Sequence, residues 1–326
     1  MRKQIEKILK LQNFFIIKSS SKNNVTYSLN KSSQLVLHNV YKNWLQSIYA
    51  KSQQNFPVYL SQKISDLKAK KSNSSYGYID HCLPKQVNEI SIEYDSENFI
   101  IRKDSQLKFT LIIPQEDVMQ YFIQWQRYRK YWWSSITTTP GLFSVNDVKH
   151  EDDNTHANIS ASFNWGHWTV ETVKMSSSKK DSKNSTLLCC STSLEKSLIT
   201  LLLDATTNST KEEYLRLHNK MAPYKISFAL SHTEKTHVSS LQELATQIYY
   251  KLLSNKISAW LPNFSLPFEP QIKENLQMGA TYTAILSEPT LSTGIFHLMN
   301  SSTMLKEQVH VADFVNYAAL LCGNRI

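Results

Sequence analysis

The sequence contains few glycines, six in 326 residues, and they are widely spaced. No two lie close enough for a G-x-G-x-x-G turn or a P-loop, the motifs in which glycine lets backbone N–H groups approach phosphates. The G-x-S-x-G and H-E-x-x-H motifs are absent as well. Histidine and serine are plentiful, so a triad assembled in space stays open, but no spacing favours one. We therefore expect a protein with no catalytic residue, no cofactor and no enzymatic activity.

Cysteine is scarcer still, and long apolar runs are missing. The four cysteines, Cys82, Cys189, Cys190 and Cys322, form no C-x-x-C pair, which argues against a zinc ribbon and against a disulfide framework. No apolar run approaches about 18 residues, the length needed to span a bilayer, so we expect no membrane partner.

One cluster of possible metal ligands lies in a predicted loop, and it contains His150, Glu151, Asp152, Asp153 and His156. Their spacing fits no regular zinc site, and a solvated acidic loop explains them better. No metal site is predicted.

Positive charge is in excess, with 36 Lys and Arg against 27 Asp and Glu, a net charge of +9. This balance suits a polyanionic partner, although a basic protein with no such partner explains the charge about as well. The chain is long enough for two domains, and at 41% hydrophobic residues it has material for real cores.

The C-terminal third alternates predicted strands and helices. Short apolar runs at 223–230, 282–286 and 294–298 indicate strands, and apolar residues at helical spacing fill 241–252 and 311–319. This order predicts an α/β domain with a largely buried sheet.

The preceding part predicts an α+β domain around an antiparallel sheet. Helices are expected at 33–52, from Pro114 onward and after Thr192. Strands are expected at 56–60, 159–163, 168–173 and 187–190, and a meander at 90–94, 99–102 and 107–113. Residues 1–10 suit either a presequence or a surface helix with Ile5, Ile8 and Leu9 facing inward, and the apolar residues that follow favour the helix. The domains are expected at 1–210 and 211–326.

Residues 281–319 carry a family resemblance, through SEPTLSTGIFHL followed by STMLKEQVHV. This run resembles the anticodon-binding-like domain that ends the accessory subunits of mitochondrial DNA polymerase gamma, a module that also ends glycyl-, prolyl- and threonyl-tRNA synthetases of class II. The likeness extends to the helix that runs into Phe56-Pro-Val, to WQRYRKYWW at 125–133, and to NWGHWTVETV, where Asn164 replaces a proline of the family.

The resemblance implies a degenerate class II synthetase-like core, followed by an anticodon-binding-like mixed five-stranded sheet. It implies a non-catalytic processivity subunit in the mitochondrial matrix, at the nucleoid, that binds the catalytic subunit and duplex primer–template DNA. The glycine-rich strand with which class II synthetases hold ATP is missing. The alternative is a divergent class II synthetase or a tRNA-binding paralogue, and a scaffold of the same fold without a nucleic-acid role is a third interpretation.

Three expectations about surfaces follow. Exposed cations on the Arg/Trp-rich helix and in the Ser/Lys-rich loop are predicted to contact DNA phosphates: Arg127, Arg129, Lys130, Lys174, Lys179, Lys180 and Lys183. The segment 290–297 is predicted to contact the catalytic subunit, through Thr290, Leu291, Gly294, Phe296 and His297. The family's dimerisation hairpin has no room in the short connection 61–75, so we do not expect a homodimer.

Overall fold

The computed structural model describes residues 2–21, 24–53, 55–60, 75–81, 83–95, 98–102, 104–151, 154–177, 185–207, 214–231 and 238–323. The chain forms two compact units, residues 1–203 and 204–326. The first holds two largely antiparallel sheets and the second a mixed sheet, so the structure is of the mixed α+β class. In these ranges no helix is both long and apolar enough to cross a bilayer.

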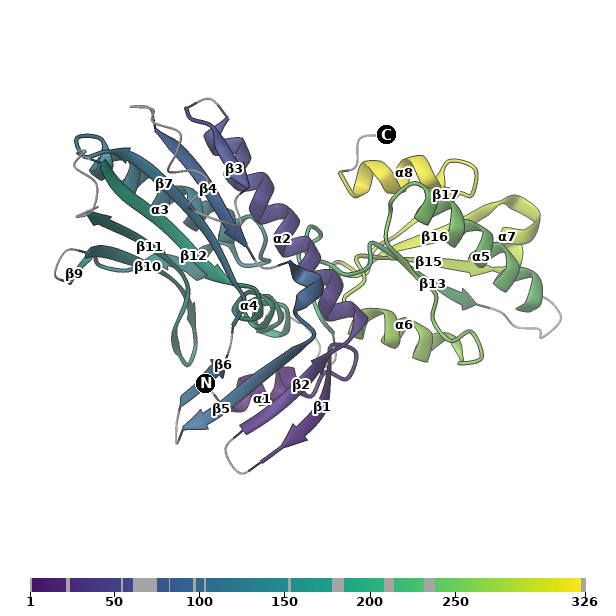
Figure 1. Ribbon diagram of the computed structural model, residues 1–326. Coiled ribbons are helices and arrows are strands. Elements are labelled where there is room, and N and C mark those ends of the chain that lie inside the picture. The colour runs from purple at the N-terminus through teal and green to yellow at the C-terminus, as the bar shows by residue number, and fades with distance from the viewer. Residues whose placement is uncertain are drawn as a thin grey trace. The chain divides into compact units, whose positions relative to one another are not determined.

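The first unit packs its helices on its sheets (Figure 1). Its helices are α1 (Arg2–Leu9), α2 (Lys31–Ser52), α3 (Val118–Ser134) and α4 (Leu194–Thr207), the last turn of which belongs to the second unit. Its strands are β1 (Phe15–Ser20), β2 (Asn24–Leu29), β3 (Val58–Leu60), β4 (Tyr76–His81), β5 (Glu89–Asp95), β6 (Asn98–Arg102), β7 (Gln106–Pro114), β8 (Phe143–Val145), β9 (Lys149–Glu151), β10 (Asn154–Phe163), β11 (Gly166–Ser177) and β12 (Ser185–Ser193).

The smaller sheet has the strand order β1-β2-β5-β6, and the larger has the order β3-β4-β7-β12-β11-β10-β8, with β9 paired to β10. Neighbouring strands are antiparallel except β3 and β4, which are parallel. The antiparallel core is therefore confirmed. The predicted meander is wrong in one respect, because β5 and β6 pair in the small sheet while β7 lies inside the large one. Along β7 one face is buried, from Leu107 to Ile113, and the other is partly exposed, at Lys108.

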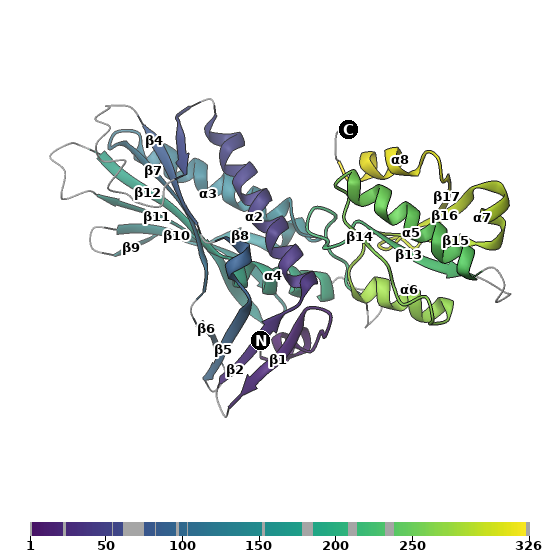
Figure 2. The same cartoon turned by 45° about the vertical axis from the view of Figure 1, so that its right-hand side comes forward.

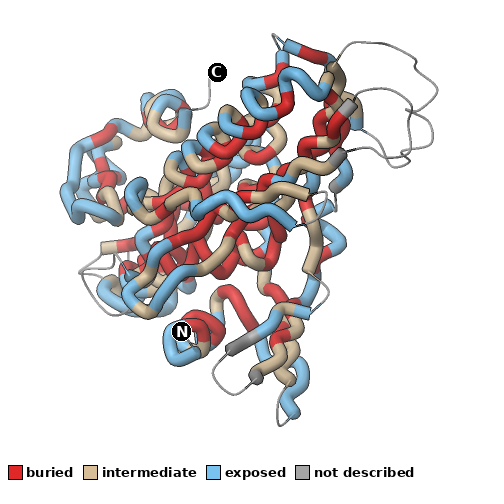
Figure 3. Tube along the Cα trace, turned by 90° about the vertical axis from the view of Figure 1, so that its left-hand side faces the viewer, coloured by how far each residue is buried: buried red, intermediate tan, exposed pale blue. Residues whose placement is uncertain are grey.

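Helix α3 covers one face of the large sheet. Val118, Phe122, Trp125 and Arg129 are all buried. The Trp125 ring lies 4.7 Å from that of Phe109 on β7, so a large aromatic contact holds the helix to the sheet. Helix α1 likewise buries its predicted inner residues, as Ile5, Ile8 and Leu9 confirm. Buried and exposed residues alternate along the helices in Figure 3.

The second unit is a five-stranded mixed sheet with helices on both faces, which confirms that part of the prediction. The order is β14-β13-β15-β16-β17, parallel among β14, β13 and β15 and antiparallel onward. Its elements are β13 (Ile226–Ser231), α5 (Val238–Ser254), β14 (Ala259–Trp260), α6 (Phe268–Gln277), β15 (Tyr282–Ser287), α7 (Glu288–Thr293), β16 (Ile295–Asn300), β17 (Lys306–His310) and α8 (Phe314–Leu321).

Successive side chains of β13 pack on opposite faces of the second unit's sheet, and both faces are covered by helices. Phe228 packs in a cluster with α5 and α8, whereas Ala229 faces the other way, toward Ile272 and Leu276 of α6. Figures 1 and 2 show α5 and α8 on one side of the sheet and α6 on the other. A strand buried on both faces has the continuous apolar character that 223–230 displays.

Candidate nucleic-acid and partner surfaces

Arg129 is the most constrained side chain of the Arg/Trp-rich helix. It is 1% exposed, and its Nε and Nη2 donate to the two carboxylate oxygens of Glu171 on β11, at 2.6 and 3.1 Å. Its Nη1 donates to Ser47 Oγ on α2 at 2.8 Å, and Trp133 Nε1 donates to Glu171 at 2.8 Å. The prediction that Arg129 contacts DNA is therefore wrong, because its guanidinium is buried and already paired.

The remaining predicted DNA contacts fall into two groups. Arg127 is exposed and Lys130 half-buried, both on α3. Lys174 is exposed on β11, three residues after Glu171, which points toward α3. Successive strand residues point to opposite faces, so Lys174 projects from the sheet face opposite to α3. Lys179, Lys180 and Lys183 lie outside the described residues.

The predicted partner segment 290–297 contains a short helix, α7, where a plain turn was expected. Thr290 is buried at its start, and its Oγ1 accepts the Ser287 N–H at 3.1 Å. Phe296 is buried with its ring 4.9 Å from that of Phe314. Both residues serve the fold, so their assignment to an exposed interface is wrong.

Gly294 ends α7 in the left-handed conformation, with φ of 70°. A Cβ there would lie 2.6 Å from His310 Nε2, so the turn and the close approach together explain the glycine. Leu291 and His297 are exposed and stay accessible to a partner. Ile295, exposed on the same strand face as His297, was missed, although the alternation around buried Phe296 signals it.

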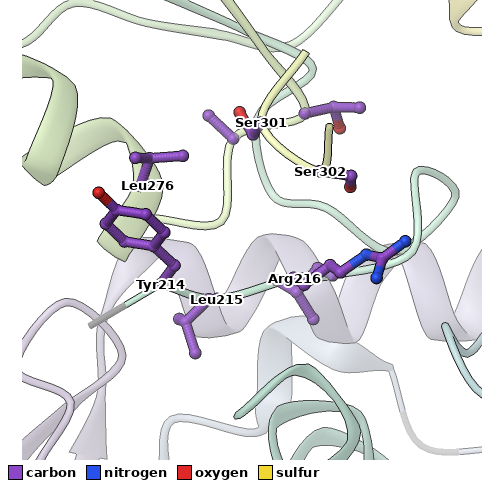
Figure 4. A pocket seen from close by; sticks show the side chains of 9 residues that line it. Tyr214, Leu215, Arg216, Leu276, Ser301 and Ser302 are labelled. Carbon is purple, nitrogen blue, oxygen red and sulfur yellow. The ribbon is translucent and has the colours of Figure 1, made fainter. Parts of the chain in front are cut away.

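The cavity shown in Figure 4 is too small to hold a cofactor. The cavity of Figure 4 lies in the second unit and holds about 20 Å³, room for roughly one water molecule. Leu215, Leu276 and Ser301 line it, and the buried Ser301 Oγ has no hydrogen-bond partner among the described residues. A small-molecule pocket is typically at least ten times larger.

The predicted acidic loop is partly a hairpin formed by β9 and β10. His150 Nδ1 and Thr155 Oγ1 lie 2.9 Å apart across it, and His156 Nε2 lies 4.0 Å from Glu151 Oε1. Asp152 and Asp153 lie outside the described residues. In the part of the chain that the structure describes, no group of three potential metal ligands comes together.

A search against protein-family models finds no match. Among curated proteins, the chain is 24% identical over 234 residues to "DNA polymerase subunit gamma-2, mitochondrial" of Xenopus laevis, which covers 61% of this chain and 50% of the relative. The corresponding identities are 24% over 235 residues in Mus musculus and 23% over 228 residues in Bos taurus. This chain is similar to the gamma-2 subunits of DNA polymerase.

The resemblance to the polymerase gamma accessory subunits is thereby confirmed. The chain spans about half the length of the gamma-2 relatives that it matches, and 61–63% of the chain itself is covered. The name of the Xenopus laevis gamma-2 subunit assigns that protein to mitochondria.

The buried pair generates a prediction about stability. Arg129→Met removes the cation and leaves the Glu171 carboxylate buried without its main partner. We expect the free energy of unfolding to fall by about 3–5 kcal/mol, measured by urea denaturation. Adding Glu171→Gln, which keeps an acceptor for Trp133 Nε1, should restore part of this stability.

The matched control is Arg127→Met, one exposed cation of the same helix, which should change stability by less than about 0.5 kcal/mol. A decrease of under about 1 kcal/mol in Arg129→Met would contradict the structural role of the pair.

Proposed function

We propose that this protein is a non-catalytic accessory subunit of mitochondrial DNA polymerase gamma. It binds the catalytic subunit and duplex primer–template DNA in the mitochondrial matrix, at the nucleoid, and increases processivity. The observation that carries the proposal is the similarity to three gamma-2 subunits along most of the chain. The arrangement of an antiparallel core and a mixed five-stranded unit supports a degenerate synthetase-like core with an anticodon-binding-like domain.

The proposed mechanism requires this protein to bind the catalytic subunit and the DNA at the same time, and it includes no chemical step on this protein. A subunit that holds both the catalytic subunit and the DNA keeps the polymerase near its template after each transient dissociation. Contacts from lysine and arginine to phosphates are suited to this task because they do not depend on base sequence. The six glycines provide no nucleotide-binding motif, which supports the assignment to a subunit without its own nucleotidyl transfer.

The proposed DNA contacts form two groups: Arg127 and Lys130 on α3, and Lys174 on β11 together with Lys179, Lys180 and Lys183, which follow it in the sequence. We propose that each group neutralises phosphates separately. The protein acts as a monomer that pairs one-to-one with the catalytic subunit, a proposal that rests on the short connection 61–75.

The DNA contacts are tested by the salt dependence of duplex binding. Affinity falls as salt rises, so the slope of log K against log salt is negative. The double variant Arg127→Gln with Lys130→Gln should reduce the absolute value of this slope by about 0.9 for each phosphate that is no longer neutralised. The quadruple Gln variant at 174, 179, 180 and 183 tests the second group in the same way. Fluorescence anisotropy with two unrelated duplexes measures both effects, which should be equal for the two sequences.

Lys3→Gln with Lys7→Gln is the control for net charge, since both lysines are exposed on α1. An unchanged slope in one group's variant removes that group from the DNA surface. A slope reduced equally by the control would mean that overall charge, rather than a defined surface, governs binding.

The partner surface that we propose consists of Leu291, Ile295 and His297, at α7 and the start of β16. All three side chains are exposed in the second unit. Two aliphatic side chains beside an imidazole can be desolvated at low cost by a complementary apolar surface. Gly294 contributes indirectly, by allowing the turn that joins α7 to β16.

Leu291→Glu should weaken binding to the catalytic subunit at least tenfold, or about 1.4 kcal/mol, because it buries an unpaired carboxylate. Its melting temperature should stay close to that of the unmodified protein, since Leu291 is 40% exposed. Leu253→Glu is the matched control, at 41% exposure on α5. Normal affinity of the Leu291 variant, or an equal decrease in both variants, would refute this surface.

A further inference from the structure

Helices α2 and α3 of the first unit share a charge pattern, to which Lys51 adds a cation outside the proposed duplex contacts. Neither sequence, KSSQLVLHNVYKNWLQSIYAKS or VMQYFIQWQRYRKYWWS, contains an aspartate or a glutamate. The charge of Arg129 is balanced by Glu171, but Lys51, Arg127 and Lys130 have no acidic neighbour on either helix. This part of the surface therefore attracts anions.

A groove of about 240 Å³ lies between these helices. Its lining residues come from α2 and from α3 with its C-terminal cap: Ser47, Ala50, Lys51, Trp125, Tyr128, Arg129, Tyr131, Trp132 and Ser135. Four of the nine are aromatic, and one is an exposed lysine. The groove thus combines flat apolar surfaces with a cation at its edge.

The aromatic side chains of the groove are held in place before any ligand arrives. The Arg129 guanidinium lies 4.2 Å from the centre of the Trp132 ring, and the Trp133 ring packs edge-on at 4.9 Å. The Lys51 ammonium lies 4.7 Å from the centre of the Tyr128 ring. Tyr131, by contrast, is 69% exposed, so much of its ring stays accessible to a ligand.

We propose that this groove binds single-stranded DNA, with an unpaired base stacked on Tyr131 and the neighbouring phosphates near Lys51, which lines the groove, and Arg127, one helical turn before Tyr131. Aromatic rings beside a cationic track are the usual means of binding a single strand without sequence preference. The inference extends the proposed function, on which it rests, since a replicating polymerase has an unpaired template strand next to its duplex.

Two other occupants fit the groove less well. A second copy of this chain, related by a two-fold axis, would bring cations against cations. A protein segment would need its own carboxylates to match Lys51 and Arg127, and aromatic walls favour a flat ring over an aliphatic side chain. Both occupants remain distinguishable by experiment.

The test is the affinity of the full-length protein for a fluorescein-labelled oligo(dT) of about 12 nucleotides, compared with a duplex. Tyr131→Ala should weaken single-strand binding about tenfold and duplex binding far less, because only an unpaired base can stack. Tyr131→Trp should retain the affinity. Lys51→Gln should reduce the absolute slope of log K against log salt for single-strand binding by about 0.7.

Tyr250→Ala is the matched control, since Tyr250 is a 64% exposed helical tyrosine of the second unit, and it should bind normally. Unchanged single-strand affinity in Tyr131→Ala, or an equal decrease for single strand and duplex, would overturn the proposal. Weaker affinity for the purified catalytic subunit, or weaker self-association, with normal oligo(dT) binding would reassign the groove to a protein partner. Salt-dependent duplex binding that persists in the Tyr131 variant would leave the proposed function standing while the single-strand site fails.

Discussion

The buried pair between Arg129 and Glu171 is the interaction on which the first unit depends most. It joins α3 to β11, and through Ser47 it reaches α2 as well. Burying two charges is costly, and the cost is offset only if the geometry is good and the remaining polar atoms are satisfied. Two bonds to the carboxylate, one to Ser47 and a further donor from Trp133 meet that condition. A network of this kind leaves α3 only one way to sit on the large sheet.

That orientation decides which side chains remain outside. With Trp125 and Arg129 turned to the sheet, Arg127 and Tyr131 project from the helix, and the groove forms where α3 meets α2. Lys174 lies on the opposite sheet face, so it cannot form one patch with Arg127 and Lys130. We propose that they contact different parts of a primer–template, and that the second unit binds the catalytic subunit. None of these roles needs a catalytic group.

Periodicity predicted the faces of helices and strands well, because burial depends on local spacing. The spacing of Ile5, Ile8 and Leu9 identified the inner side of α1, and the alternating order of the last third predicted an α/β unit. Local spacing cannot predict the ion-pair partner of Arg129, because Glu171 lies 42 residues later, on strand β11. A basic residue on a helix is expected to be exposed, so the sequence alone does not identify Arg129 as buried. The prediction that Thr290 contacts a partner is wrong for a local reason, because Ser287, Pro289 and Thr290 form the start of helix α7. The side of the sheet on which Lys174 lies depends on packing that no spacing encodes.

The most direct test of the account is primer extension by the catalytic subunit on singly primed single-stranded DNA, with excess competitor DNA so that each polymerase binds once. Adding this protein should lengthen the products of a single binding event, and the effect should decline as salt rises. Products of unchanged length, from a complex shown by sedimentation to have formed, would contradict the assignment to a processivity subunit.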